Sequence, residues 1–188
     1  SAWRVTTAKF SGSKYSSRNQ IQRQKDMAMI YSEVPCKAAG TFTTNIVKAA
    51  PVKWDHNVVY NSKAAQAVVI NAGIANACTG EEGMGYCKQT AEKVEKVLGI
   101  AADEVLVAST GVIGMQLPID RICNGIDAMV PQLKGDTGSG TEASKAIMTT
   151  RYKKQRGGSD HRTWWKNGND RRHVQRLRHD PSEYVYDA

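Results

Sequence analysis

The sequence lacks a long apolar run, a secretory signal and a metal-ligand pattern. It contains no stretch of about 18 apolar residues, so no transmembrane helix is expected. Its first residues have no apolar core of the secretory type. No C-x-x-C pair occurs, and no histidine stands at metal-ligand spacing from the four cysteines, which are Cys36, Cys78, Cys87 and Cys123. These absences predict reduced thiols, no metal site and a cytoplasmic protein.

Acidic residues are missing or scarce in two windows of the chain. Residues 11–25 contain four basic residues and no acid, and residues 151–188 contain ten basic and five acidic residues. The rest of the chain has a net charge of −1, although the whole chain has +8. A basic tail is typical of proteins that bind nucleic acid or anionic membranes. That interpretation predicts a stable module whose binding needs residues 151–188.

The second window also lacks the apolar periodicity of folded elements. A disordered basic tail is the simplest interpretation, but disordered tails are poor in tryptophan and tyrosine. This window carries several such residues, namely Tyr152, Trp164, Trp165, Tyr184 and Tyr186. Its composition therefore fits neither a folded domain nor a disordered tail.

Between the two windows, strand patterns alternate with helix patterns. Apolar or β-prone runs predict strands, or strand ends, at residues 27–31, 41–45, 67–70 and 105–108. Helices are expected over residues 80–98, 119–130 and 142–148, the last after a flexible loop at 135–140. This alternation predicts a layered α/β domain over residues 1–150.

The expected helices have recognisable ends and apolar faces. Thr79 is placed to cap the first helix, Gly99 to end it, and Pro118 to open the second. The inward positions expected for the first helix are Cys87, Thr90, Ala91, Val94, Val97 and Leu98. Those expected for the second helix are Ile122, Ile126 and Met129.

The strand at 105–108 is followed by Ser109, Thr110 and Gly111. One interpretation is a buried strand that ends in an ordinary turn of small residues. Such a turn can also direct unpaired backbone N–H groups and a hydroxyl at one point, where a developing oxyanion can be held. Glycine at position 111 lets the backbone approach a substrate closely, but these residues alone leave both interpretations open.

Several strings together resemble the ornithine acetyltransferase (bifunctional glutamate N-acetyltransferase) family of arginine biosynthesis, specifically its α chain. In order along residues 25–150 they are KDMAMIYSEVP, AAGTFTTNIVKAAPV, QAVVINAG, ANACTGEEG, EVLVASTGVIG, LPIDRI and KAIMTT. One departure is Ile74, where the family usually has asparagine. The resemblance implies the α chain of a self-cleaved enzyme of the N-terminal-nucleophile type, with a layered α/β fold.

In this family the string GGMxKGSGMIHPNMATML precedes the cleavage site, and it is absent here as written. Codons compatible with residues 164–188, read with a one-base shift, encode GGKTVTIGGMCKGSGMIHPNMCTM. A shifted reading of residues 11–25 likewise gives FPEANTHRGIKYRDKK, which is close to the family pattern. We therefore expect residues 11–25 and 151–188 to be out-of-frame translations. The cause is either an error in the recorded sequence or a real frameshift that leaves an inactive α-chain remnant.

The resemblance implies acetyl transfer from N2-acetylornithine to glutamate through an acetyl-threonine intermediate. The nucleophilic threonine begins the β chain, so it is not in this chain, and its own α-amine is the implied base. Thr110 and Gly111 take the oxyanion-hole role. Thr149 and Thr150 match a substrate-contacting segment, although helix-end hydroxyls bonded to backbone explain them equally well. Asn76, Thr79 and Gly80 receive no role, because capping accounts for Thr79, and a lone His56 is expected at the surface.

The resemblance also implies partners and alternatives. The β chain from the same precursor is the expected partner, in an α2β2 heterotetramer, and a lone α chain is expected to be insoluble because it exposes an apolar face. No metal or tightly bound cofactor is implied, and acetyl-CoA is a possible alternative acetyl donor. The enzymatic alternative is a related N-terminal-nucleophile aminopeptidase or amidohydrolase.

Overall fold

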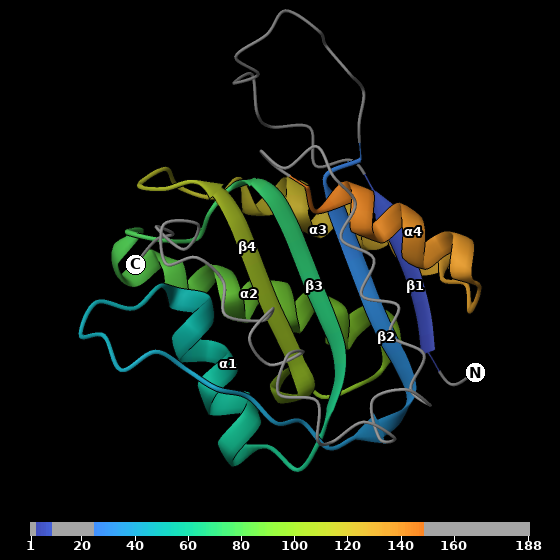
Figure 1. Cartoon of the computed structure of the whole chain (residues 1–188), viewed down its shortest axis with the longest axis horizontal. Helices are drawn as coiled ribbons and strands as arrows, with labels where there is room; N and C mark the ends of the chain where they lie inside the picture. The colour runs from blue at the N-terminus through green and yellow to red at the C-terminus, as the bar shows by residue number, and fades with distance from the viewer. Residues whose placement is uncertain (1–2, 9–24, 149–188) are drawn as a thin grey trace, which may run out of the picture. The chain divides into compact units, whose positions relative to one another are not determined.

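The computed structural model describes residues 3–8 and 25–148 of the chain. Four strands form one sheet in the order β1-β2-β3-β4 (Figure 1). Their bounds are Trp3–Ala8 for β1, Met27–Cys36 for β2, Ala65–Ile74 for β3 and Val105–Val112 for β4. The pairs β1–β2 and β2–β3 are antiparallel, whereas β3–β4 is parallel. This sheet and its helices agree with the α/β class expected from the sequence.

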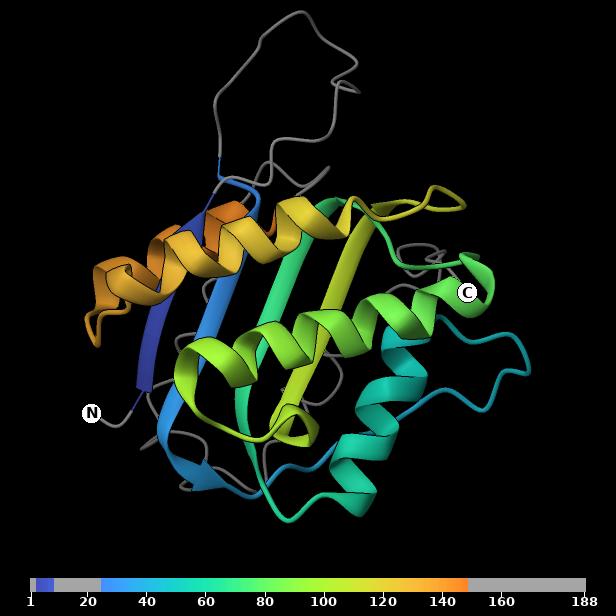
Figure 2. The same cartoon turned by 180° about the vertical axis from the view of Figure 1, so that it is seen from behind.

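Four helices accompany the sheet. They are α1 (Ala50–Asn61), α2 (Gly80–Leu98), α3 (Ile119–Met129) and α4 (Thr137–Ala146). Single 3₁₀ turns lie at Ala102–Glu104 and Val130–Gln132. Helices α2 and α3 cross one face of the sheet, and α1 lies beside β4 (Figures 1 and 2). No described helix is long and apolar enough to cross a membrane.

The core lies between the sheet and helices α2 and α3. Side chains that alternate along the strands meet the apolar stripes of these helices, as a half-buried sheet requires. The cluster includes Met27, Met29, Val69, Val94, Val105, Ile122, Ile126 and Met129, each at most 2% exposed. The inward positions predicted for α3 are confirmed.

The opposite face of the sheet is less fully covered. Over β3 and β4 it carries Val68 and Ile70, paired in register with Leu106 and Ala108. All four of these apolar side chains are half-buried.

Helix α2 begins and ends where the sequence predicted. Gly99 adopts a left-handed conformation (φ 71°), and its N–H donates to the Glu95 carbonyl, which ends the helix. Cys87, Thr90, Ala91 and Val94 are buried as expected, whereas Val97 and Leu98 are only partly buried. The predicted cap is wrong, because the Thr79 side chain makes no capping bond.

Other predictions of local structure were wrong. Residues 41–45 form no strand, because β propensity alone supplies no pairing partner. Residues 137–140, expected within a flexible loop, begin α4, and the Asp136 carboxylate accepts a 2.7 Å hydrogen bond from the Ser139 N–H at its start. Helix α1 and strand β1 had not been predicted at all.

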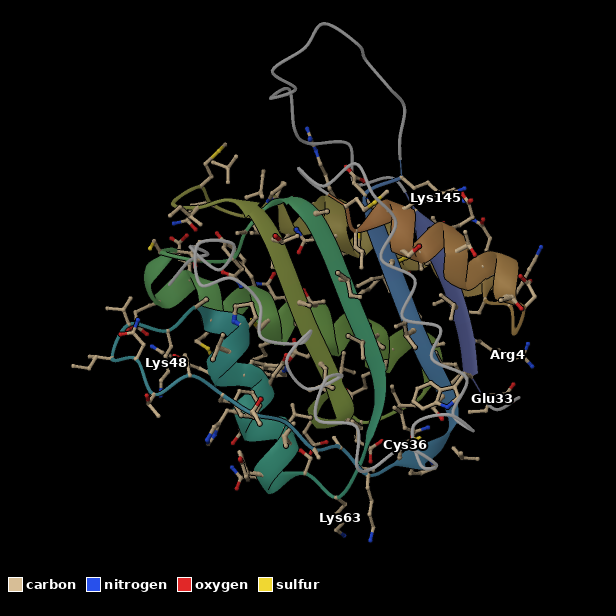
Figure 3. All side chains as sticks on the ribbon, viewed as in Figure 1. Arg4, Glu33, Cys36, Lys48, Lys63 and Lys145 are labelled. Carbon is tan, nitrogen blue, oxygen red and sulfur yellow. The ribbon has the colours of Figure 1, made fainter. Side chains whose placement is uncertain are left out.

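The described ion pairs lie at the surface. Arg4 of β1 and Glu33 of β2 form one of them, at the edge of the sheet opposite β4 (Figure 3). Exposed pairs of this kind contribute little to stability, so the core and the backbone pairing carry the fold.

Candidate active site at the ends of β3 and β4

Thr110 and Gly111 lie in the last part of β4 and are exposed. They do not form a turn, as the sequence had suggested, because the strand continues to Val112 in register with β3. Thr110 pairs with Ala72 and Gly111 with Gly73, and the chain bends only at residues 113–115. The parallel neighbour β3 therefore holds both candidate residues at the carboxyl end of the sheet.

Gly73 and Gly111 both have a backbone conformation that other residues rarely adopt. Their φ values are 123° and 134°. A Cβ atom built on Gly111 would lie 2.2 Å from both the carbonyl carbon and the carbonyl oxygen of Gly73. The two strands can therefore approach this closely only because position 111 has no side chain.

Ser109 connects the end of β4 to the loop that follows β3. Its Oγ accepts a hydrogen bond from the Asn76 backbone N–H at 2.9 Å. The same hydroxyl donates to the Ile74 carbonyl at 3.2 Å. The Ala75 N–H also donates to the Val112 carbonyl at 2.9 Å. These bonds hold the residues on both sides of Thr110 and Gly111.

Asn76 is only 2% exposed, and its side chain is fully hydrogen-bonded. Its Nδ2 donates to the Gly83 carbonyl in α2 at 2.8 Å, and its Oδ1 accepts from the Thr79 hydroxyl at 2.7 Å. Thr79 thus binds Asn76 instead of capping α2. A Cβ atom on Gly83 would lie 2.2 Å from the Thr79 Oγ1 and 2.8 Å from the Asn76 Oδ1, so this close packing needs glycine.

Ile74 stands where a polar residue had been expected from the family pattern. Its side chain is 5% exposed and belongs to the core cluster. Its carbonyl accepts hydrogen bonds from the Asn71 side-chain amide at 2.8 Å and from Ser109. Position 74 therefore contributes a backbone acceptor to the site.

Helix α1 is bonded to the outer side of β4. The Trp54 Nε1 donates to the Val105 carbonyl at 2.8 Å, and the Asp55 Oδ1 accepts from the Val107 N–H at 2.9 Å. These two strand groups consequently point away from β3. Backbone groups of alternate residues in a strand point the same way. The two bonds from α1 therefore determine which backbone groups of β4 face α1 and which face β3, from Val105 to Val107.

Two titratable groups near Val107 of β4 have raised pKa values: the half-buried Asp55 and the fully buried Cys87. Burial raises the pKa of Asp55 from its ordinary 3.8 to about 6, although the bond from the Val107 N–H opposes this shift. Burial, followed by the nearby Asp55 charge, raises the pKa of Cys87 to about 12. Cys87 is therefore a protonated, unreactive thiol at neutral pH.

The remaining predicted residues divide into two groups. Thr149, Thr150 and the window at 151–188 lie outside the described residues, as do residues 11–24. His56 is exposed, as expected, and packs against Phe42 with ring centroids 5.1 Å apart. The four cysteines are free, and residues 3–8 and 25–148 contain no group of three potential metal ligands.

Sequence reasoning missed three contributors to this site. Asp55 was overlooked because its partner, Val107, is 52 residues away. Asn76 was set aside once Thr79 had been assigned as a cap. Gly73 gave a usable signal, since a glycine inside an apolar run marks a close backbone approach.

Comparison with known proteins decides the family. The model of the ArgJ family matches residues 10–161 of this chain. The chain belongs to the ArgJ family. The arginine biosynthesis bifunctional protein ArgJ of Thermotoga neapolitana is 48% identical over 130 residues, which is 69% of this chain and 32% of that protein. The chain thus spans about a third of the length of this curated relative.

Solved ArgJ structures share the fold. The arginine biosynthesis bifunctional protein ArgJ of Bacillus halodurans matches with a TM-score of 0.71 and 30% identity, over 81% of this chain and 74% of that chain. The ornithine acetyltransferase of Mycobacterium tuberculosis, solved in complex with ornithine, matches with a TM-score of 0.72 and 37% identity. That match covers 81% of this chain and 78% of the solved chain. The α/β architecture is therefore that of ornithine acetyltransferases.

Proposed function

We propose that this chain is the α chain of an enzyme that transfers an acetyl group from N2-acetylornithine to glutamate. The nucleophile is a threonine at the start of a partner β chain from the same precursor. Its hydroxyl attacks the acetyl carbonyl, the amide C–N bond breaks, and the departing amine takes a proton. The amine of glutamate then attacks the acetyl-threonine ester, forms the new amide and releases the threonine.

Each attack places negative charge on the acetyl oxygen, and Thr110 and Gly111 stabilise this charge. The observation that carries the proposal is the exposed Thr110–Gly111 pair, held at the carboxyl end of the sheet by register with β3. By strand alternation the Gly111 N–H points away from β3, to the same side as the Val107 N–H, and α1 bonds to this side only as far as Val107. A preorganised donor of this kind contributes about 10²-fold or more in turnover.

The exposed apolar surface near these residues is an argument for a partner chain that binds there. Val112, Ile113 and Met115 follow directly in sequence and are 43%, 47% and 38% exposed. By alternation Thr110 lies on the sheet face that carries Leu106 and Ala108, which is the less covered face. A β chain seated there would bury these groups and bring its first residue to Thr110. From the family membership we also propose an α2β2 heterotetramer located in the cytoplasm.

A second part of the proposal concerns how the chain divides into segments. Residues 1–150 form the α-chain domain, and residues 11–25 and 151–188 are out-of-frame readings of family segments. Thr149 and Thr150 contact substrate just before the altered window. No metal or tightly bound cofactor takes part, and acetyl-CoA serves at most as an alternative acetyl donor.

The intact mass of each polypeptide in the purified protein tests processing and reading frame together. Two chains, the second starting with threonine, are expected, together with transfer of acetyl from N2-acetylornithine to glutamate. A single chain with the mass of the written sequence and no transfer would mean an inactive remnant. Release of amino-acid anilides without acetyl transfer would favour the aminopeptidase alternative.

A further inference from the structure

Thr110 and Gly111 lie at an exposed strand end, so their orientation depends on neighbouring groups. Ser109 is the residue directly before them, and its hydroxyl is held from two sides. It accepts from the Asn76 N–H at 2.9 Å and donates to the Ile74 carbonyl at 3.2 Å. Ile74 is the last residue of β3 and Asn76 lies in the loop that follows it, so the hydroxyl connects the ends of two parallel strands in addition to their backbone pairing.

The N–H donor that holds Ser109 is itself fixed by a buried network. The Asn76 amide bonds to the Gly83 carbonyl in α2 at 2.8 Å and to the Thr79 hydroxyl at 2.7 Å. Its Nδ2 also lies 3.4 Å from the Cys87 Sγ. Asn76 and Thr79 are 2% and 5% exposed, so solvent cannot replace these bonds. The start of α2 therefore sets the position of the loop, and the loop sets the position of Ser109.

We propose that Ser109 and Asn76 are positioning residues for acetyl transfer: through the Ser109 hydroxyl they fix the peptide groups of Thr110 and Gly111. The proposal rests on the proposed function of Thr110 and Gly111. Neither residue touches the substrate. They act by holding donors at a fixed distance from the developing oxyanion, where a displacement of about 1 Å can lower turnover by about 10²-fold.

Three variants and one matched control test this role in the purified protein with any partner chain retained. Ser109→Ala removes both bonds, and Ser109→Thr keeps the hydroxyl. Thr79→Val removes the bond to Asn76 while preserving side-chain shape. Ser32→Ala is the control, because Ser32 is fully buried in β2 and its hydroxyl donates to the Val34 carbonyl at 2.7 Å, near the opposite end of the sheet.

The expected result is a loss of kcat with little change in KM. Ser109→Ala should lower kcat by about 10-fold or more, Thr79→Val by about 3-fold, and Ser109→Thr should restore most of the activity. Ser32→Ala should lower the unfolding midpoint as much as Ser109→Ala does while kcat stays at the wild-type value. Equal kcat in Ser109→Ala and wild type, or an equal loss in Ser32→Ala, would overturn the proposal.

Amide hydrogen exchange provides a readout that does not need activity. In Ser109→Ala the amides of Thr110 and Val112, which by alternation point toward β3, should exchange faster than in wild type, whereas those of Leu106 and Val107 should not change. Unchanged exchange at Thr110 and Val112 would overturn the positioning role even in a protein with no transferase activity. An inactive wild-type protein whose exchange responds as expected would instead contradict the proposed function alone.

Discussion

Gly73 and Gly111 are paired directly across β3 and β4, and both have positive φ values, 123° and 134°. The Cβ position of Gly111 would coincide with the Gly73 peptide, 2.2 Å from its carbonyl carbon and oxygen. The parallel strands therefore leave no room for a side chain at position 111, directly after Thr110. The proposed oxyanion donors thus lie where the pairing of β4 with β3 requires glycine.

Gly111→Ala should strongly destabilise the end of β4. The added methyl group collides with backbone, which cannot move as a flexible side chain can, and alanine is strained at this φ. We expect a loss of at least about 3 kcal/mol in the free energy of unfolding, measured by urea denaturation. Gly114→Ala is the control: its φ is 76° but no atom lies within 4 Å, so the loss should be about 1 kcal/mol. Equal losses would exclude the collision as the cause.

Thr110→Ala should lower turnover by about 10²-fold with little change in stability. Thr110 is exposed, so its removal leaves no cavity and no buried group without a partner. Steady-state acetyl transfer and thermal unfolding on the same preparation check both halves of this prediction. Wild-type turnover in this variant would remove the Thr110 side chain from the mechanism.

Gly83→Ala should destabilise the protein, although alanine normally stabilises a helix by about 0.5–1 kcal/mol relative to glycine. The new methyl group would lie 2.2 Å from the Thr79 Oγ1 and 2.8 Å from the Asn76 Oδ1. Gly85 lies in the same helix, and its nearest atom is the Gln89 Nε2 at 3.9 Å. We expect Gly85→Ala to raise the free energy of unfolding and Gly83→Ala to lower it by about 2 kcal/mol. A stabilised Gly83→Ala variant would contradict the tight packing of Thr79 and Asn76.

Asp55 should make the protein less stable as the pH rises from about 4 to about 6. Its folded-state pKa of about 6 exceeds the ordinary 3.8, so the folded protein binds more protons in this window and loses that advantage as the pH increases. A shift of this size corresponds to about 3 kcal/mol, and the partial exposure of Asp55 reduces the expected effect to about 1–2 kcal/mol.

The Asp55→Asn variant separates the contribution of Asp55 to the pH dependence of stability from that of other carboxyl groups. Asparagine can still accept from the Val107 N–H through its Oδ1 but carries no charge. The stability of the variant relative to wild type should therefore increase between pH 4 and pH 7, as measured by urea denaturation at each pH. A constant difference across this range would show that Asp55 does not titrate there.

The sequence predicted the elements whose pattern is local. Ile122, Ile126 and Met129 repeat at helical spacing, and all three are buried in α3. Gly99 ends α2 in a left-handed conformation, which glycine adopts more readily than other residues. In both cases a short stretch of sequence determines the outcome.

Features that depend on distant contacts could not be predicted in this way. Helix α1 buries only Ala50, Pro51 and Val58, so its apolar pattern is weak, and it is held to β4 by Trp54 and Asp55. The proposed site residues Thr110 and Gly111 lie near the end of a strand, where the sequence placed them. Its partner Gly73 depends on the register between β3 and β4, which local sequence does not encode.

The bonds from α1 to β4 have a consequence for self-association. An uncovered strand edge offers a template on which copies of a protein can stack into insoluble fibres. Trp54 and Asp55 occupy the first half of this edge, at Val105 and Val107. An incoming strand therefore finds backbone groups only beyond Val107, which is too short a segment for extended fibre growth. Helix α1 thus protects the sheet while leaving the segment around Thr110 accessible.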